Sequence, residues 1–251
     1  MASPRFEIFG TEEELAAGAA ARVLDRLRQA LALEGRATVA LSGGSTPAPL
    51  YRRLGAAPAA LAWKRVELFW ADERCVPPEH PESNFRLARE TFLDPLGLAG
   101  DTVHRIRGEL PPEDAAARYE AELAAAFAED PPRFDLALLG VGTDGHTASL
   151  FPGGPELAEV RRRAVATRAP EAPRDRVSLT LPVLDAARAA LFLVAGERKA
   201  EIVARILAGG AETRDLPAAR VRPPRGELLW LLDEAAASRL PGAARKAPAP
   251  R

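Results

Sequence analysis

Two hydrophobic spacings alternate along this chain. Short continuous apolar runs predict buried strands at residues 37–41, 65–70, 134–139, 177–181, 189–195 and 228–232. Between these runs, apolar residues recur at helical spacing and predict helices at 83–92, 111–128 and 197–207, and one that begins at Pro47. Thr11 and Glu14 form a capping box, which predicts a further helix from there to about Leu33, ended by Gly35.

Strands that alternate with helices in this way favour an α/β fold with a mostly parallel central sheet. Because the apolar runs are continuous, we expect helices to cover both faces of that sheet. No repeat or long linker interrupts the pattern, so we predict a single domain over residues 1–240. Residues 241–251, rich in Pro and Ala, are expected to form a flexible C-terminal tail.

The charge and the cysteine content of the chain limit which kinds of partner it is expected to bind. Thirty-four Lys and Arg residues against 35 Asp and Glu residues give a formal net charge of -1, so no basic field indicates nucleic acid or an anionic membrane. The single cysteine, Cys75, has no metal-ligand spacing around it, so we expect no metal.

Apolar stretches fall short of the roughly 18 residues of a membrane span, and the start lacks the apolar core of a signal peptide. We expect a soluble, cytoplasmic protein.

Three polar or glycine-rich loops follow predicted strands, at residues 42–46, 71–74 and 140–146. Ligands of parallel sheets bind beyond the carboxyl ends of the strands, so these loops are expected to meet. The first, SGGST before Pro47, leaves backbone N–H groups free at the start of a helix, which suits a phosphate. A tight turn that needs its glycines for geometry alone is the alternative.

The third loop contains Asp144 and His146. Imidazole can take up and return a proton near neutral pH, and a carboxylate two residues away could orient it. Residues 140–145 also spell Gly-x-Gly-x-x-Gly, the pattern of dinucleotide-binding loops. We reject a nicotinamide site because no acidic residue ends a following strand near residue 165.

Three further charged positions complete the candidate set. Arg74 follows Asp72 and Glu73 after a predicted strand, and its guanidinium suits a phosphate or carboxylate. Arg176 precedes a strand and Lys199 lies at a strand-to-helix junction. Each could equally be an ordinary surface charge, and each gains meaning only if it reaches the pocket of the glycine loop.

Taken together, these motifs resemble the 6-phosphogluconolactonase family of the oxidative pentose phosphate pathway. Glucosamine-6-phosphate deaminase, a relative of that family, shares a Gly-x-Asp-Gly-His core but typically has a tyrosine where this chain has Arg74. It also has Asn-Glu-Pro in the region of SLFP at 149–152, so both positions favour the lactonase. The matching stretches are LSGGSTP (41–47), WADERCVPPEHPESNF (70–85), FDLALLGVGTDGHTASLFPG (134–153), PRDRVSLTLPVL (173–184) and GERKAEI (196–202).

The resemblance implies a three-layer, Rossmann-like sandwich and hydrolysis of 6-phospho-D-glucono-1,5-lactone to 6-phospho-D-gluconate without a cofactor. It implies His146 as the base that activates water and then as the acid, with Asp144 in support. The substrate-binding residues that it implies, together with neighbours in the same motifs, are Gly43, Gly44, Ser45, Asp72, Arg74, Asn84, Gly145, Arg176 and Lys199. Backbone N–H groups of residues 142–145 are candidates to stabilise the oxyanion.

Two alternative functions stay open from the sequence. The shared core allows an amino-sugar phosphate deaminase, in which Asp72 would be the base. A non-catalytic phosphosugar-binding domain is the other, although the first 35 residues offer one helix rather than a DNA-binding module. The expected partner is a small phosphorylated sugar lactone, and the expected assembly is a monomer or a small homo-oligomer.

Overall fold

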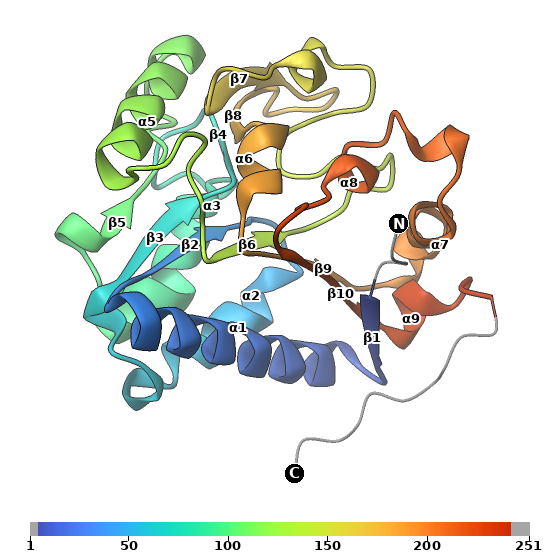
Figure 1. Ribbon diagram of the computed structural model, residues 1–251, viewed down its shortest axis with the longest axis horizontal. Coiled ribbons are helices and arrows are strands. Elements are labelled where there is room, and N and C mark those ends of the chain that lie inside the picture. Colours follow the sequence, from blue (N-terminus) through green and yellow to red (C-terminus); the bar gives the residue numbers. More distant parts are fainter. Residues whose placement is uncertain (1–4, 242–251) are drawn as a thin grey trace.

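Seven parallel strands form the central sheet of the structure, a computed structural model that describes residues 5–241 (Figure 1). Their order across the sheet is β1-β10-β9-β6-β2-β3-β5. The strands span Arg5–Phe9 (β1), Ala37–Leu41 (β2), Val66–Trp70 (β3), Val103–His104 (β5), Leu136–Leu139 (β6), Ala189–Val194 (β9) and Glu227–Asp233 (β10). This sheet, with its helical layers, confirms the predicted α/β sandwich.

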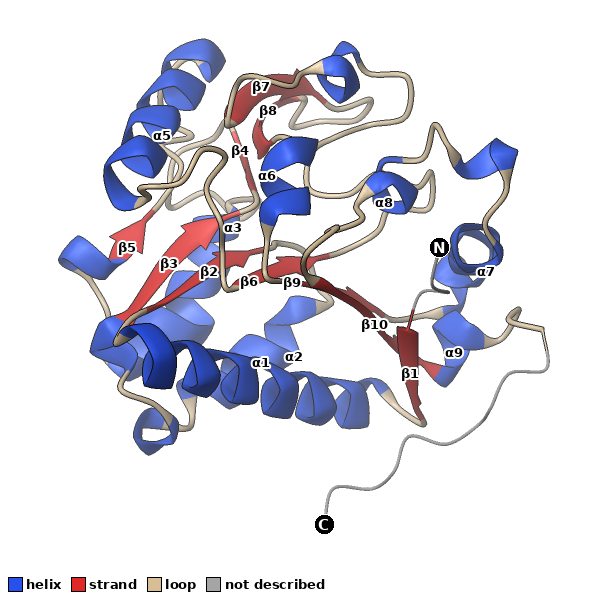
Figure 2. Cartoon of the chain, viewed as in Figure 1, coloured by secondary structure: helices blue, strands red, loops and turns tan. Residues whose placement is uncertain are grey.

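Helices lie on both sides of the central sheet (Figure 2). Helices α1 and α2 cover its lower face in Figure 1, and α6 and α8 lie above it. The α-helices span Glu12–Glu34 (α1), Pro47–Gly55 (α2), Asn84–Ala88 (α3), Asp94–Leu96 (α4), Pro112–Ala126 (α5), Leu181–Ala186 (α6), Ala200–Ala208 (α7), Pro217–Arg220 (α8) and Glu234–Ala237 (α9). A π-helical turn, Arg89–Leu93, joins α3 to α4, and 3₁₀ turns occupy Pro58–Ala60, Trp63–Arg65, Gly100–Thr102, Pro155–Ala158, Glu197–Lys199 and Ala211–Thr213.

A second, three-stranded antiparallel sheet stands above the central one, in the order β4-β8-β7. It consists of Asp72–Arg74 (β4), Ala164–Arg168 (β7) and Asp175–Leu179 (β8). The apolar run predicted as a strand at 177–181 belongs here, two residues earlier than expected, because Leu181 already begins α6. In this sheet Arg74 lies opposite Arg176, and Asp72 opposite Ser178.

The two ends of α1 lie where the capping residues of the sequence predicted them. Thr11 accepts a hydrogen bond from the Glu14 N–H at 3.1 Å, and so caps α1 as the capping box predicted. At the other end Gly35, with φ of 74°, donates its N–H to the Leu31 carbonyl. That left-handed conformation favours glycine, so the helix ends where the sequence indicated.

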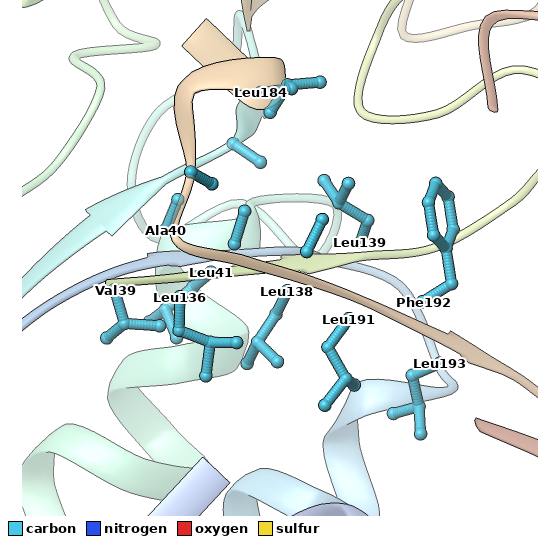
Figure 3. Close-up of a cluster of buried hydrophobic side chains, with 14 of the residues drawn as sticks. Val39, Ala40, Leu41, Leu136, Leu138, Leu139, Leu184, Leu191, Phe192 and Leu193 are labelled. Atoms are coloured by element: carbon cyan, nitrogen blue, oxygen red, sulfur yellow. The ribbon is translucent and has the colours of Figure 1, made fainter. Parts of the chain in front are cut away.

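The core lies between the central sheet and its helices. Figure 3 shows Phe192 and Leu139 projecting from one face of the sheet, while Leu191, Leu193 and Leu138 project from the other. All five side chains are buried. Apolar residues at consecutive positions thus serve opposite faces of one sheet, which explains the uninterrupted apolar runs.

None of the helices within residues 5–241 combines the length and the apolar character needed to cross a bilayer. Most of the predicted C-terminal tail, residues 242–251, lies outside the described residues.

Replacing Phe192 by Ala should destabilise the protein strongly. The Phe192 ring is fully buried and stacks on Trp230 with a centroid distance of 4.1 Å. Removing such a ring leaves a cavity and costs about 3–5 kcal/mol. Thermal and urea unfolding of the Phe192→Ala variant measure the loss. Leu33→Ala is the control because Leu33 is 84% exposed, and an equal loss in both variants would contradict this account of the core.

Candidate active site

A cleft of about 550 Å³ opens beyond the carboxyl ends of β2, β6 and β9. The three loops expected to meet, after residues 41, 70 and 139, all contribute to its lining. Nine of the site residues named from the sequence line it: Gly43, Gly44, Ser45, Asp72, Arg74, Asp144, His146, Arg176 and Lys199. Distant segments of chain therefore form one site at one edge of the sheet.

Asp144 and His146 form a hydrogen-bonded pair within this cleft. His146 Nδ1 lies 2.7 Å from Asp144 Oδ1, and the same oxygen accepts the His146 backbone N–H at 3.1 Å. Partial burial raises the pKa of Asp144, but the hydrogen bond and charge of His146 outweigh it, so the net shift of that pKa is downward. An ionised Asp144 holds a proton on Nδ1 and leaves Nε2 as the basic nitrogen.

Gly142 provides the space in which this pair sits. A Cβ atom at Gly142 would lie 2.0 Å from His146 Nδ1 and 2.4 Å from Asp144 Oδ1. Both distances are far below van der Waals contact, so any side chain at this position would displace the imidazole or the carboxylate. The glycine is required by the close approach of the pair to the backbone.

Hydrogen bonds inside the loop decide which N–H groups are free for an oxyanion. The Gly142 N–H donates to the His146 carbonyl at 2.9 Å, and the Gly145 N–H donates to the Gly142 carbonyl at 3.0 Å. Of the four N–H groups predicted as candidates, these two are therefore engaged. The Asp144 N–H interacts with its own carboxylate, so within residues 5–241 the Thr143 N–H is the one of the four that has no acceptor.

Another part of the cleft wall is formed by β4. The Asp72 side chain is buried, and its Oδ2 accepts a hydrogen bond from Ser149 Oγ at 2.6 Å. Next to it in the cleft, Arg74 donates to the carbonyl of Glu82 and lies 3.4 Å from the Glu82 carboxylate. Asp72 and Arg74 thus both line the cleft from one short strand.

Arg176 is the unusual charge of the site. The residue is only 9% exposed, and among the described residues neither its Nε nor its Nη1 has a hydrogen-bond partner. Burial lowers its pKa, and the neighbouring Arg74 cation lowers it further. Buried guanidinium groups normally find acceptors, so Arg176 has the donors that an anion in the cleft would need.

Lys199 supplies a third cation, from the 3₁₀ turn Glu197–Lys199 that leads into α7. Partial burial lowers the pKa of Lys199, the Asp144 charge opposes that shift, and the Arg198 charge adds to it. The glycine loop lies at the start of α2, where the helix has no side-chain cap. Its N–H groups, with Gly44 at φ of 91°, lie at the positive end of the helix dipole.

Two of the named residues do not line the cleft. Asn84 is buried behind the wall, where its Nδ2 donates to the Asp72 carbonyl at 2.9 Å. Gly145 lies within the histidine loop but packs against the protein interior, where a Cβ atom would meet Leu216 at 2.8 Å. Both support residues of the cleft without lining it themselves.

Ser149 and Phe151 also line the cleft, although from the sequence they served only to separate two families and were not predicted as site residues. The Phe151 ring lies 4.9 Å from the His146 ring at an angle of 48°. Both residues stand within the stretch GTDGHTASLFP, so their position beside the histidine was the available signal.

No group of three or more His, Cys, Asp or Glu side chains within residues 5–241 is arranged to hold a metal ion.

Comparison with known proteins identifies the family. The model for "Glucosamine-6-phosphate isomerases/6-phosphogluconolactonase" matches residues 10–230. The chain is 40% identical to 6-phosphogluconolactonase from Synechocystis over 95% of its length and 99% of that protein. It is 45% identical to the human 6-phosphogluconolactonase, over 94% of this chain and 95% of the human one.

A solved structure agrees with this assignment. 6-Phosphogluconolactonase from Trypanosoma brucei superposes with a TM-score of 0.84 at 29% identity, covering 94% of this chain and 98% of that chain. Sequence similarity and shared architecture both extend over nearly the full length. The chain therefore belongs to the glucosamine-6-phosphate isomerase/6-phosphogluconolactonase family.

Proposed function

We propose that this protein hydrolyses 6-phospho-D-glucono-1,5-lactone to 6-phospho-D-gluconate in the pentose phosphate pathway, with His146 as general base and acid. The observation that carries the proposal is the Asp144–His146 pair opening onto the same cleft as Arg74, Arg176 and Lys199. An acid–base group and an anion-binding surface within one cleft are what a phosphorylated lactone requires. The 6-phosphogluconolactonase relatives support the same reaction.

The reaction needs one proton carrier. Nε2 of His146 takes a proton from water as the water oxygen bonds to the lactone carbonyl carbon, which places negative charge on the carbonyl oxygen. The Thr143 N–H, which has no acceptor among the described residues, is the candidate to stabilise that oxyanion. When the tetrahedral intermediate collapses, the bond from carbon to the ring oxygen breaks and the imidazolium returns the proton to that oxygen.

Asp144 supports His146, and the cations of the cleft bind the phosphate. Asp144 keeps the Nδ1 proton in place and stabilises the imidazolium that forms. The cations and the N–H groups of Gly43, Gly44 and Ser45 hold the phosphate, whose charge of about -1.5 to -2 matches them. Arg176 gains the acceptors that it lacks among the described residues. Binding at the phosphate fixes the lactone carbonyl near His146.

The deaminase alternative makes a different use of the same cleft. Asp72 would have to act as a base, yet its Oδ2 is already hydrogen-bonded to Ser149 and the carboxylate is buried. Ammonia release from glucosamine 6-phosphate above background would favour that alternative. Phosphosugar binding without turnover of any substrate would favour a non-catalytic domain.

Further sequence-based predictions accompany the proposal. We propose one domain over residues 1–240, a monomer or small homo-oligomer, a cytoplasmic location, and no nucleic-acid partner. The near-neutral formal charge of -1 supports the last of these. Analytical ultracentrifugation measures the assembly.

His146→Ala should lower kcat for lactone hydrolysis by about 10²- to 10⁴-fold, because general acid–base catalysis is worth that much. The assay follows acid release, corrected for spontaneous hydrolysis. Phe151→Leu is the matched control, since it changes the neighbouring ring but keeps the imidazole. A His146→Ala enzyme within a few-fold of the parent would remove His146 from the mechanism.

Arg176→Ala should raise KM for the phosphorylated lactone far more than it lowers kcat, because a contact to the remote phosphate is largely uniform binding. Its unfolding temperature should stay level or rise, since an incompletely hydrogen-bonded buried cation is lost. Activity on glucono-1,5-lactone, which has no phosphate, should be little changed. A fall in kcat with an unchanged KM would contradict the phosphate contact.

Affinity for 6-phosphogluconate should fall at alkaline pH. The fall should begin at a lower pH than it would if Lys199 had the pKa of an ordinary lysine. Charged Lys199 attracts the phosphate, so affinity is full below its pKa and is lost as pH rises through it. Because that pKa is lowered, the loss precedes the ordinary lysine range near ~10.4. Calorimetry from pH 7 upward measures this on a stable ligand. Lys199→Arg should abolish the decline, and persistence of the decline in that variant would assign it elsewhere.

A further inference from the structure

Glu73 is a buried carboxylate that the proposed mechanism does not use. It is 2% exposed and lies in β4 between Asp72 and Arg74, two residues that line the cleft. Successive side chains of a strand point to opposite faces, so Glu73 extends away from the cleft, behind the wall that its two neighbours form.

The Glu73 carboxylate accepts four hydrogen bonds. The donors are the N–H groups of Arg74 at 2.7 Å, of Asn84 at 2.8 Å and of Phe85 at 2.8 Å, and the Ser83 hydroxyl at 3.0 Å. Two of these N–H groups, those of Asn84 and Phe85, lie in the first turn of α3, where backbone N–H groups have no acceptor within the helix. Glu73 therefore joins β4 directly to the start of α3.

Among the described residues no Lys, Arg or His side chain places a charged nitrogen within 4.0 Å of the Glu73 carboxylate, although the Arg74 backbone N–H does bond to it. Burial raises the pKa of Glu73 to about 7, while the three backbone N–H groups act in the opposite direction. Hydrogen bonds rather than an ion pair therefore stabilise the ionised form of Glu73. Those bonds are directional, and they fix where β4 and α3 lie relative to each other.

Asn84, at the start of α3, extends this connection to two parts of the cleft. Its Nδ2 donates to the Asp72 carbonyl at 2.9 Å. Its side chain also fills the space beside Gly43, where a Cβ atom would lie 1.7 Å from Asn84 Oδ1. The position of α3 consequently determines both the Asp72 wall and the support beneath the glycine loop.

We propose that Glu73 is the positioning residue of the anion-binding half of the cleft. By fixing the start of α3 it places Asp72 and Arg74 directly, and through Asn84 it places the glycine loop. The inference rests on the proposed function only in identifying that half as the phosphate site. The Asp144–His146 pair belongs to the loop after β6 and has no contact with Glu73 among the hydrogen bonds of the described residues.

Glu73→Gln tests this role because it keeps the shape of the side chain but turns one acceptor into a donor. A donor facing the N–H groups of α3 cannot reproduce the four bonds. We expect KM for the phosphorylated lactone to rise about tenfold, as displaced binding groups cost at least that much. We expect kcat to stay within about twofold, since the acid–base pair is untouched.

Asp135→Asn is the matched control. Asp135 is 4% exposed and accepts hydrogen bonds from the Thr38 N–H and hydroxyl, at the opposite end of β2 from the cleft. If Glu73 served stability alone, both variants would lose unfolding temperature and leave KM unchanged. The positioning role is supported if KM rises in Glu73→Gln but not in Asp135→Asn. An unchanged KM in Glu73→Gln, or a fall in its kcat alone, overturns it.

Two additions keep the test decisive. If Glu73→Gln does not fold, Ser83→Ala removes one of the four bonds and should raise KM several-fold in the same direction, and an unchanged KM there also overturns the proposal. Calorimetric affinity for inorganic phosphate reads the site without turnover. A parent protein that hydrolyses no lactone would refute the proposed function, whereas equal phosphate affinity in the parent and in Glu73→Gln would refute the role of Glu73.

Discussion

The common direction of the seven central strands is the constraint on which the rest of the molecule depends. Parallel strands end at the same edge, so the loops after β2, β6 and β9 open on one side although they come from distant parts of the chain. Continuous apolar strands, buried on both faces, hold that edge in place. The cleft is therefore a consequence of strand direction, and its chemistry is a matter of which residues stand at the strand ends.

Two kinds of backbone conformation adapt this edge to its task. At Gly142 the chain gives up a side chain so that an imidazole and a carboxylate can lie against the backbone. At β4 the chain turns from the parallel sheet into a short antiparallel one, which brings Asp72 and Arg74 beside Ser178 and Arg176. Gly142 thus makes room for the acid–base pair, and the antiparallel pairing of β4 supplies much of the cationic surface.

The sequence predicted the central sheet because its strands carry a strong signal, as in residues 134–139 and 189–195. It did not predict β4, since three polar residues carry no apolar pattern, or β1, whose side chains are only partly buried at the sheet edge. Nor did it predict the two-residue strand β5 or the strand β7 of the second sheet. Without β4 the antiparallel pairing of Arg74 with Arg176 could not be foreseen. Loop residues with recognisable motifs were placed near one another, but which of them line the surface depended on packing, as Asn84 and Gly145 show.

The closely spaced cations of the cleft also bear on how a catalytic cycle ends. Opening a lactone ring creates a carboxylate, so the product carries one more negative charge than the substrate that entered. Arg74, Arg176 and Lys199 attract that additional charge. Attraction to these cations thus opposes product release, and dissolved salt, which screens charges beyond about 8 Å at physiological ionic strength, reduces the recapture of product that has already left the cleft.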